Sequence, residues 1–200
     1  MRARVILVLL VGVCAAVLAA EVATANRLAY TEQIIRSIYN NNFIIASSIG
    51  GLIRCSVTIE RTVHGRTIAK TAGALIGYIN RASKGSCGGG EMRFNTETLP
   101  WHSQYSSFSG TLPNIIAYTE AARRMSLEVN GEAFGLRVTC RYTIPSKPYV
   151  DNRETRGTIT SESLGSESAS SETLGCPSIT LTGTASVTNS GGGTVVVTLV

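Results

Sequence analysis

The segment 53-IRCSVTIE-60 alternates apolar and polar residues along its whole length. Ile53, Cys55, Val57 and Ile59 occupy every second position, which is the pattern of a β-strand with one buried face. The same period runs through residues 134–144, where the residues of one face are Phe134, Leu136, Val138, Cys140, Tyr142 and Ile144. We therefore expect Cys55 and Cys140 to face a hydrophobic core.

Two hairpins are predicted around this pattern. Asn130-Gly131, a favoured pair for tight turns, separates the alternating run 125–129 from the run 134–144. Residues 179–187 and 194–200 form a second pair of β-rich runs, with a turn predicted at 189–193. The fold class that follows is mainly β, an antiparallel β-sandwich or barrel-like domain with one possible helix.

That possible helix spans residues 67–82. Thr67 could cap its N-terminus, and the apolar residues at helical spacing are Ile68, Ala72, Leu75, Ile76 and Ile79. Gly73 and Gly77 favour a strand instead, since each costs about 1 kcal/mol inside a helix. Residues 26–43 are equally open to a helix or a strand.

The stretch 151–175 differs in composition from the rest. It is rich in Ser, Glu and Gly, and SESLG at Ser161 recurs as SETLG at Ser171. Few large apolar residues are available for burial, so we interpret it as a mobile acidic surface connection within a single domain, residues 26–200.

The N-terminal 25 residues have the features of a secretory signal peptide. Arg2 and Arg4 precede an apolar run, and Ala23-Thr24-Ala25 matches a signal peptidase site. The run from Val5 to Ala20 is shorter than the roughly 20 residues of a membrane-spanning helix. We expect a cleaved leader, no stable transmembrane anchor, and a secreted, extracellular or cell-surface protein.

Four cysteines follow the leader: Cys55, Cys87, Cys140 and Cys176. An even number in an exported chain indicates two disulfides, and their similar spacings favour sequential pairing among three possible connectivities. A zinc site is the alternative, but no CxxC pair is present and the histidines lie far from the cysteines in sequence. We expect no metal and no cofactor.

The charge is mildly basic, with 18 Lys and Arg against 13 Asp and Glu and a formal net charge of +5. The basic residues are scattered and lack the interleaved aromatic residues of a single-strand nucleic-acid site. We expect no nucleic-acid partner. An anionic polymer of the cell envelope remains compatible with this charge.

Residues 96–116 contain the candidate ligand surface. Trp101, His102, Tyr105 and Phe108 follow one Leu-Pro step and precede another, and these steps set an extended or turning backbone. The aromatic residues could line a carbohydrate or lipid site, or could equally be ordinary core residues.

The strings TIAKTAGALIGYINRA, ETLPWH and SFSGTLPNI, with the cysteine-led strands after them, resemble a group of uncharacterised secreted actinobacterial proteins. The order Cys, Cys, Leu-Pro-Trp, Cys, Cys is more distantly similar to secreted proteins identified as activators of alkane oxidation. These resemblances imply a compact extracellular β domain and contact with apolar compounds. They carry over no catalytic residues.

The residue inventory argues against an enzyme. A Ser-His-Asp triad has only His64, His102 and Asp151 to draw on, and no GxSxG elbow is present. Our first hypothesis is a secreted, non-catalytic binding or cell-envelope-associated module. The alternatives are a carrier or binder of lipid or another apolar small molecule, and a secreted hydrolase.

Overall fold

The computed structural model describes residues 27–48, 51–111, 114–133, 136–146, 148–151 and 158–199. At residues 108–111, 114–124, 133, 145, 146, 148–151 and 199 it describes the backbone alone. The elements are β1 (Arg27–Tyr30), β2 (Ile34–Ser47), β3 (Gly51–Val63), β4 (Thr67–Ala69), β5 (Leu75–Gly88), β6 (Glu91–Phe94), the 3-10 helix η1 (Thr96–Thr98), β7 (Trp101–Thr111), β8 (Asn114–Ala133), β9 (Leu136–Ser146), β10 (Pro148–Asp151), β11 (Thr158–Ile159), β12 (Ser161–Ala169), β13 (Ile179–Asn189) and β14 (Val195–Leu199).

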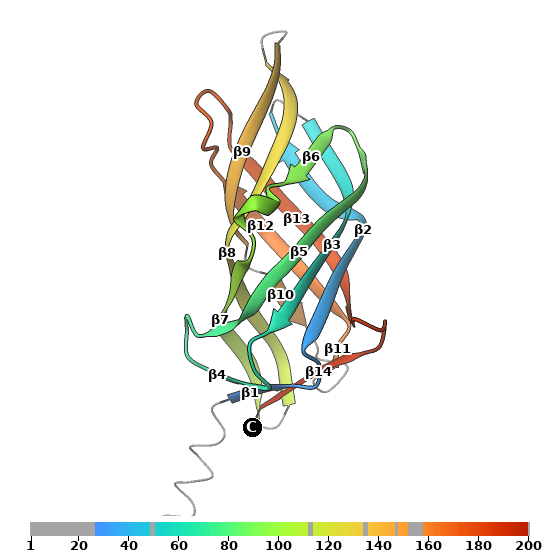
Figure 1. Ribbon diagram of the computed structural model, residues 1–200, viewed down its shortest axis with the longest axis vertical. Coiled ribbons are helices and arrows are strands. Elements are labelled where there is room, and N and C mark those ends of the chain that lie inside the picture. Colours follow the sequence, from blue (N-terminus) through green and yellow to red (C-terminus); the bar gives the residue numbers. More distant parts are fainter. Residues whose placement is uncertain are drawn as a thin grey trace, which may run out of the picture.

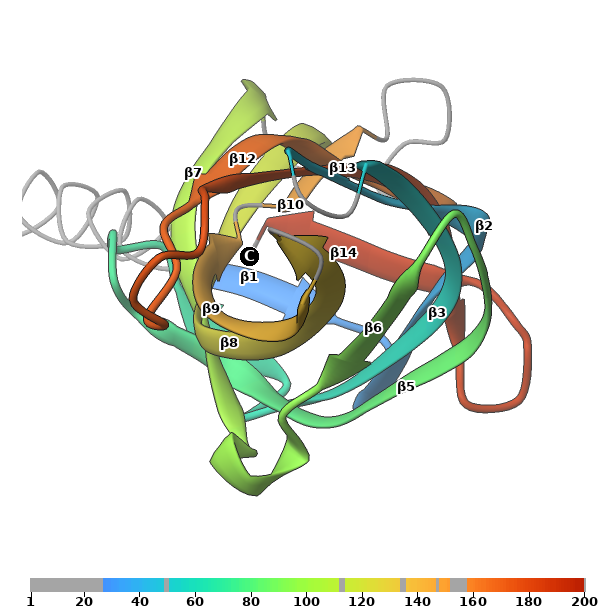
Figure 2. The same ribbon diagram turned by 90° about the horizontal axis from the view of Figure 1, so that it is seen from above.

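The strands pair antiparallel and the sheet closes on itself. The order β10-β12-β13-β2-β3-β5-β7-β8 ends at a strand that also pairs with β10, which completes a ring of pairings. Figures 1 and 2 show the resulting elongated, barrel-like shape, with most strands following the long axis. The predicted mainly β, antiparallel fold is confirmed.

The first and last described strands close one end of this shape. β14 pairs with β1, and β1 pairs with β4, so the sheet continues past the ring at that end. Seen from above, β1 and β14 cross within the outline of the other strands (Figure 2). A core cluster lies here, formed by Leu28, Tyr30, Ile35, Val63, Ile68, Ile76, Tyr105, Ile159, Val187, Val195 and Val197.

The remaining interior is a second, larger apolar cluster built from alternating strand residues. On β3, Ile53, Cys55, Val57 and Ile59 are all buried, as their spacing predicts. Cys140, Tyr142 and Ile144 on β9 join the same cluster, whereas Leu136 is 70% exposed. The prediction that both cysteines face the core is confirmed.

Two disulfides connect to this larger cluster. Cys55 on β3 bonds to Cys87 on β5, and Cys140 on β9 bonds to Cys176 in the connection before β13. Sequential pairing is therefore confirmed. Because both buried sulfurs belong to the main core, each bridge ties a more exposed strand end or loop to the interior.

The possible helix at 67–82 is wrong: the chain forms β4, a turn and β5 there. Register shifts interrupt the pairing of β5 with β3 and β7, so its buried residues Ile76, Ile79 and Ala82 fall three positions apart. An interval of three residues is close to one turn of a helix, so the sequence pattern resembled a helix. Gly73 has a φ of +85° in the turn, a conformation that glycine adopts readily.

Residues 27–30 and 34–43 are also strands, which settles the second open stretch for the described residues. A register shift between Tyr39 and Phe43 places these two buried rings four residues apart. Asn41, inside the shift, has a φ of 53°. The residues that suggested a helical stripe were Ile34, Ile35, Ile38 and Tyr39, and they come from both faces of this strand. Ile35 and Tyr39 are buried, whereas Ile34 and Ile38 are 38% and 37% exposed.

The interpretation of 151–175 as a surface connection is wrong for Ser161–Ala169. These residues form β12, paired with β13 along most of its length and with β10 on its other side. Leu164 and Ala169 are buried, and so is Glu162. Backbone pairing, which needs no apolar side chain, places this polar segment in the sheet. Residues 152–157 lie outside the described part.

The first predicted hairpin is present with a different turn. β8 and β9 pair from Met125 with Ile144 to Ala133 with Leu136, so the strands run past Asn130-Gly131. Asn130 is held within the sheet, because its side chain accepts a hydrogen bond from Thr139 and donates one to Glu91. The link between the strands, residues 134–135, lies outside the described residues.

The second predicted hairpin is wrong in its pairing. A turn does follow Asn189, whose side-chain oxygen accepts hydrogen bonds from the backbone of Gly191 and Gly193. However, β13 pairs with β2 and β12, whereas β14 pairs with β1, β8 and β11. The turn therefore carries the chain from the wall of the sheet to its closed end.

The predicted signal peptide, residues 1–25, lies outside the described residues. In the part of the chain that the structure does describe, no helix has the length and apolar character needed to cross a membrane.

Gly77 offers a test of the packing between β3 and β5. A β-carbon at this position would lie 2.1 Å from the Thr62 carbonyl oxygen, in the backbone of the neighbouring strand. We expect Gly77→Ala to lower the free energy of unfolding by about 2–3 kcal/mol, as overpacking does. Urea denaturation measures this change.

Gly88→Ala is the matched control on the same strand, because a β-carbon there meets nothing within 4 Å. It should leave the unfolding free energy unchanged or slightly higher. Equal stabilities of the two variants would contradict the close approach of β3 and β5.

Candidate functional site

The predicted ligand surface is divided by the alternation of β7. Trp101 and Tyr105 point inward, with 0% and 5% of their surface exposed, whereas His102 between them is exposed. Phe108 lies further along β7, paired in register with Tyr118, and its side chain is outside the described set. The structure therefore does not bring Trp101, His102 and Tyr105 onto one surface.

The two inward rings belong to different core clusters. Trp101 packs on Phe94 with ring centroids 5.9 Å apart, and its indole Nε1 donates a hydrogen bond of 2.7 Å to Thr98 Oγ1. Tyr105 belongs to the cluster at the closed end, where burial raises the pKa of its phenol. Both act as core residues in this arrangement.

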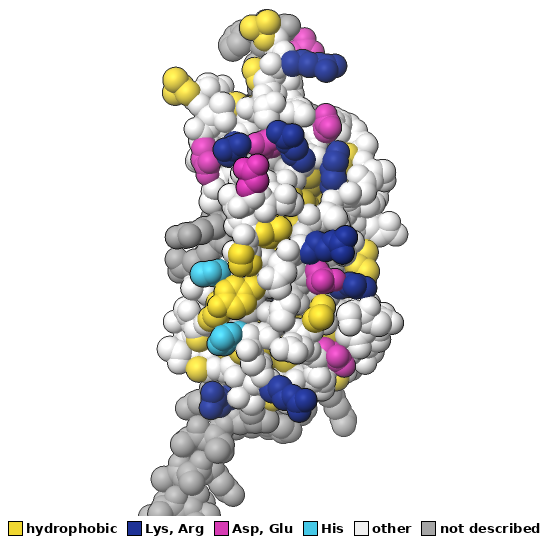
Figure 3. All heavy atoms as spheres, viewed as in Figure 1, with side chains coloured by type: hydrophobic (Ala, Val, Ile, Leu, Met, Phe, Trp, Pro, Cys, Tyr) yellow, Lys and Arg dark blue, Asp and Glu magenta, His cyan; other side chains and the backbone are white. Residues whose placement is uncertain are grey.

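His102 instead joins an aromatic row on the outer face. It pairs across strands with Tyr78 on β5, and the two rings meet edge to face at 5.4 Å. On the other side of Tyr78 lies His64, in the turn after β3, again edge to face at 6.1 Å. Both histidines of the chain thus flank one tyrosine (cyan in Figure 3).

The neighbours of Tyr78 on β3 and β5 are rich in hydrogen-bonding groups. Thr62 is the cross-strand partner of Tyr78 on β3, and Asn80 donates a hydrogen bond of 2.7 Å to the Thr62 hydroxyl. We call His64, Tyr78, His102, Thr62 and Asn80 together the Tyr78 site. Its tyrosine and imidazole rings offer apolar contact area beside amide and hydroxyl groups.

Sequence reasoning identified His102 but missed Tyr78 and His64. Tyr78 lies in the stretch whose bulged strand imitates a helix, and His64 comes directly after β3. A correct assignment of β5 as a strand next to β7 would have brought Tyr78 and His102 together. No local signal in the sequence specifies that pairing.

An ion pair is buried inside the sheet. Arg61 on β3 and Glu162 on β12 are each 4% exposed, and Arg61 Nη2 lies 3.1 Å from Glu162 Oε2. The Tyr39 hydroxyl donates a second hydrogen bond, of 3.0 Å, to Glu162 Oε1. The carboxylate is therefore satisfied by two donors, one from β2 and one from β3.

A second acidic group lies at the junction of β6, β8 and β9. Glu128 is the direct cross-strand partner of both Arg93 and Arg141. Arg141 Nη2 lies 2.8 Å from Glu128 Oε1, and Arg93 Nε binds Oε2. These hydrogen bonds, from Arg141 first and Arg93 second, lower the pKa of the Glu128 carboxyl.

Within the described ranges, no three His, Cys, Asp or Glu side chains come together in a way that could hold a metal ion. Cys55, Cys87, Cys140 and Cys176 are all occupied in disulfides.

No family model, no curated protein and no solved structure matches this chain. The resemblance based on ETLPWH and SFSGTLPNI stays a prediction. Function has to be inferred from the geometry of the sites.

Glu128 and its two partners Arg93 and Arg141, which we call the Glu128 ladder, predict how the stability of the fold depends on pH. Because its pKa is lowered in the folded protein, the unfolded chain takes up the proton first as the pH falls below the ordinary glutamate value of about 4.3. The ladder stabilises the fold above that pH. Its contribution to the free energy of unfolding is lost as the pH falls through the pKa that Glu128 has in the folded protein. We expect Glu128→Gln to cost about 1 kcal/mol at pH 7 and almost nothing near pH 3.

Urea denaturation at both pH values measures the difference. Glu132→Gln is the control, since Glu132 is an exposed carboxylate on the same strand and the same side of β8. An equal loss for Glu128→Gln at both pH values would contradict the ionic origin of its contribution.

Proposed function

We propose that this chain is a secreted, non-catalytic binding module that attaches to a neutral polysaccharide at the cell surface through the Tyr78 site. The observation that supports it is the aromatic row on the outer face, in which the exposed rings of His64 and His102 lie on either side of the half-buried Tyr78. Sugar rings have apolar faces and hydroxyl edges, so they match aromatic rings bordered by amide and hydroxyl groups.

The position of the site supports attachment to an extended polymer. Tyr78 and His102 lie on neighbouring strands of the sheet wall, and His64 is in the turn beside them. Figure 3 shows hydrophobic and His side chains gathered along this face. A long chain can lie across such a wall, whereas a small molecule would leave most of its own surface in water.

The two disulfides are consistent with an oxidising compartment outside the cytoplasm. Together with the predicted leader, they support secretion. A binding role at the envelope needs no catalytic group and agrees with the mildly basic, mostly uncharged composition.

The alternative role, a carrier of lipid or another apolar molecule near Trp101, is less well supported. Trp101 is fully buried against Phe94 and its indole N–H is already hydrogen-bonded to Thr98. A ligand would have to open the main core to reach it, and well-packed cores resist such opening.

Tyr78→Ala tests the proposal. Removing the central ring should weaken binding to the polysaccharide by about tenfold, which corresponds to about 1.4 kcal/mol. Affinity electrophoresis and pull-down with cellulose, dextran and galactan measure the binding. Tyr78→Phe keeps the ring and should retain most of the affinity.

Lys84→Gln is the control for non-specific charge, since Lys84 lies further along β5 and forms an ion pair with Glu91. Its binding should match the wild type. Full binding by folded Tyr78→Ala, or no binding of the wild type to any of the three polysaccharides, would overturn the proposed function.

A further inference from the structure

A small pocket lies between two connections near the closed end of the sheet. Its walls are residues 30–33, from the end of β1 to the start of β2, and residues 63–66, which join β3 to β4. The pocket measures about 290 Å³, at the lower end of the range for ligand sites, so it accepts only a small molecule. It shares no lining residue with the Tyr78 site, so the inference drawn from it is independent of polysaccharide binding.

Backbone hydrogen bonds hold the two walls of the pocket together. Tyr30 N donates to the Arg66 carbonyl at 3.0 Å, and Val63 N donates to the Gln33 carbonyl at 2.8 Å. Each connection is therefore tied directly to the other at two points. The pocket is preformed, which reduces the ordering cost of binding a ligand.

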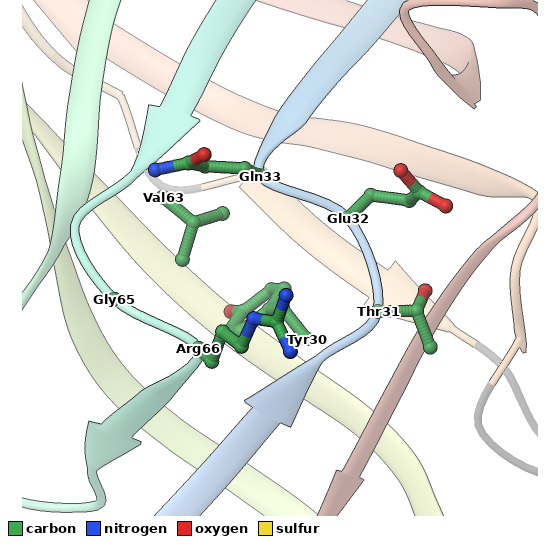
Figure 4. A pocket seen from close by; sticks show the side chains of 7 residues that line it. All are labelled: Tyr30, Thr31, Glu32, Gln33, Val63, Gly65 and Arg66. Atoms are coloured by element: carbon green, nitrogen blue, oxygen red, sulfur yellow. The ribbon is translucent and has the colours of Figure 1, made fainter.

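The side chains of the first wall do not all face the same way. Figure 4 shows Glu32 turned to the opposite side of the connection 30–33 from Arg66, Val63 and Tyr30. The last three side chains, in contrast, lie close to one another between the two connections (Figure 4). The carboxylate of Glu32 is therefore directed away from a ligand that lies among these three.

The charge that such a ligand meets is the guanidinium of Arg66. Arg66 is exposed, and in the part of the chain that the structure describes its side chain forms no ion pair and no hydrogen bond. Around it, in residues 27–33 and 64–74, the basic residues Arg27, Arg66 and Lys70 outnumber the single acidic residue Glu32. Lys and Arg side chains are also visible at this lower end of the molecule in Figure 3. A local excess of positive charge attracts anions.

The other side of the space is apolar. Val63 and Tyr30 are 2% and 6% exposed, and both belong to the core cluster at the closed end. An apolar group of a ligand that covers them gains up to about fourfold in affinity for each methylene that it removes from water. A fully polar anion such as phosphate gains nothing from these two side chains.

We propose that this pocket binds a small monocarboxylate with an apolar tail, of the short-chain fatty acid class. A guanidinium donates two parallel hydrogen bonds to a carboxylate, and Arg66 supplies the one guanidinium that a single negative charge needs. The tail of the ligand lies against Val63 and Tyr30. The ligand is thus recognised by its charge at one end and by its apolar surface at the other.

Titration of the ¹⁵N-labelled wild-type protein with butyrate, followed by NMR, tests the proposal and locates the site. Amide resonances of residues 30–33 and 63–66 should shift and saturate in the millimolar range. Butyramide has the same tail without the charge and should bind at least about tenfold more weakly. Acetate has two methylenes fewer and should also bind about tenfold more weakly. Phosphate should bind more weakly than butyrate.

Arg66→Gln should weaken butyrate binding by about tenfold or more. Arg27→Gln is the matched control, because it removes another exposed guanidinium from the same end of the molecule without touching the pocket lining. It should bind butyrate like the wild type. Glu32→Gln should bind butyrate equally or slightly more tightly, since its carboxylate is turned away. Urea denaturation confirms that each variant is folded.

Three results would overturn the inference. The first is the absence of saturable shifts in residues 30–33 and 63–66, including the case in which the shifts lie elsewhere in the protein. The second is an affinity of folded Arg66→Gln that equals that of the wild type or of Arg27→Gln. The third is binding of butyramide or phosphate as tight as that of butyrate, which would make the ligand class wrong. The first and third use the wild-type protein alone, so they apply even if Arg66→Gln fails to fold.

Discussion

The buried ion pair between Arg61 and Glu162 is the contact on which the closed sheet depends. The two residues are 101 positions apart in sequence, and β13 and β2 separate their strands in the sheet order, so the pair crosses the interior. A charge buried without its partner is strongly destabilising. A shift of β12 by one residue would turn Glu162 to the outside and remove its carboxylate from Arg61, so the pair selects one register.

The closed sheet encloses its apolar residues and leaves the outer wall to partners. Two apolar clusters fill the inside, and the aromatic residues of β7 that look most like a ligand site are part of them. In the part of the chain that the structure describes, the outer wall around Tyr78 offers aromatic and hydrogen-bonding groups to a partner. The interior provides stability, and the Tyr78 site uses the rigid backbone that this interior supports.

Local patterns predicted the strands with regular alternation, such as residues 53–59, and the spacing of the cysteines favoured their pairing. The possible helix, the surface connection and the ligand surface were predicted wrongly or incompletely, each for an identifiable reason. Register shifts in β5 changed a period of two into a spacing that resembles a helix. In β2, the apolar residues that suggested a helix belong to both faces of one strand. β12 has little apolar surface and enters the sheet through backbone pairing and one buried carboxylate, whose arginine partner is distant in sequence. The Tyr78 site depends on neighbouring strands that no short segment specifies.

A double-mutant cycle on Arg61→Met and Glu162→Leu tests the central claim most directly, with urea denaturation as the measurement. We expect each single variant to lose about 3–5 kcal/mol, because each removes one member of a buried ion pair and keeps the other charge buried. The double variant should lose far less than the two losses combined, with a coupling energy of at least about 2 kcal/mol. Additive losses, or single variants as stable as the wild type, would contradict a closed sheet held by this pair.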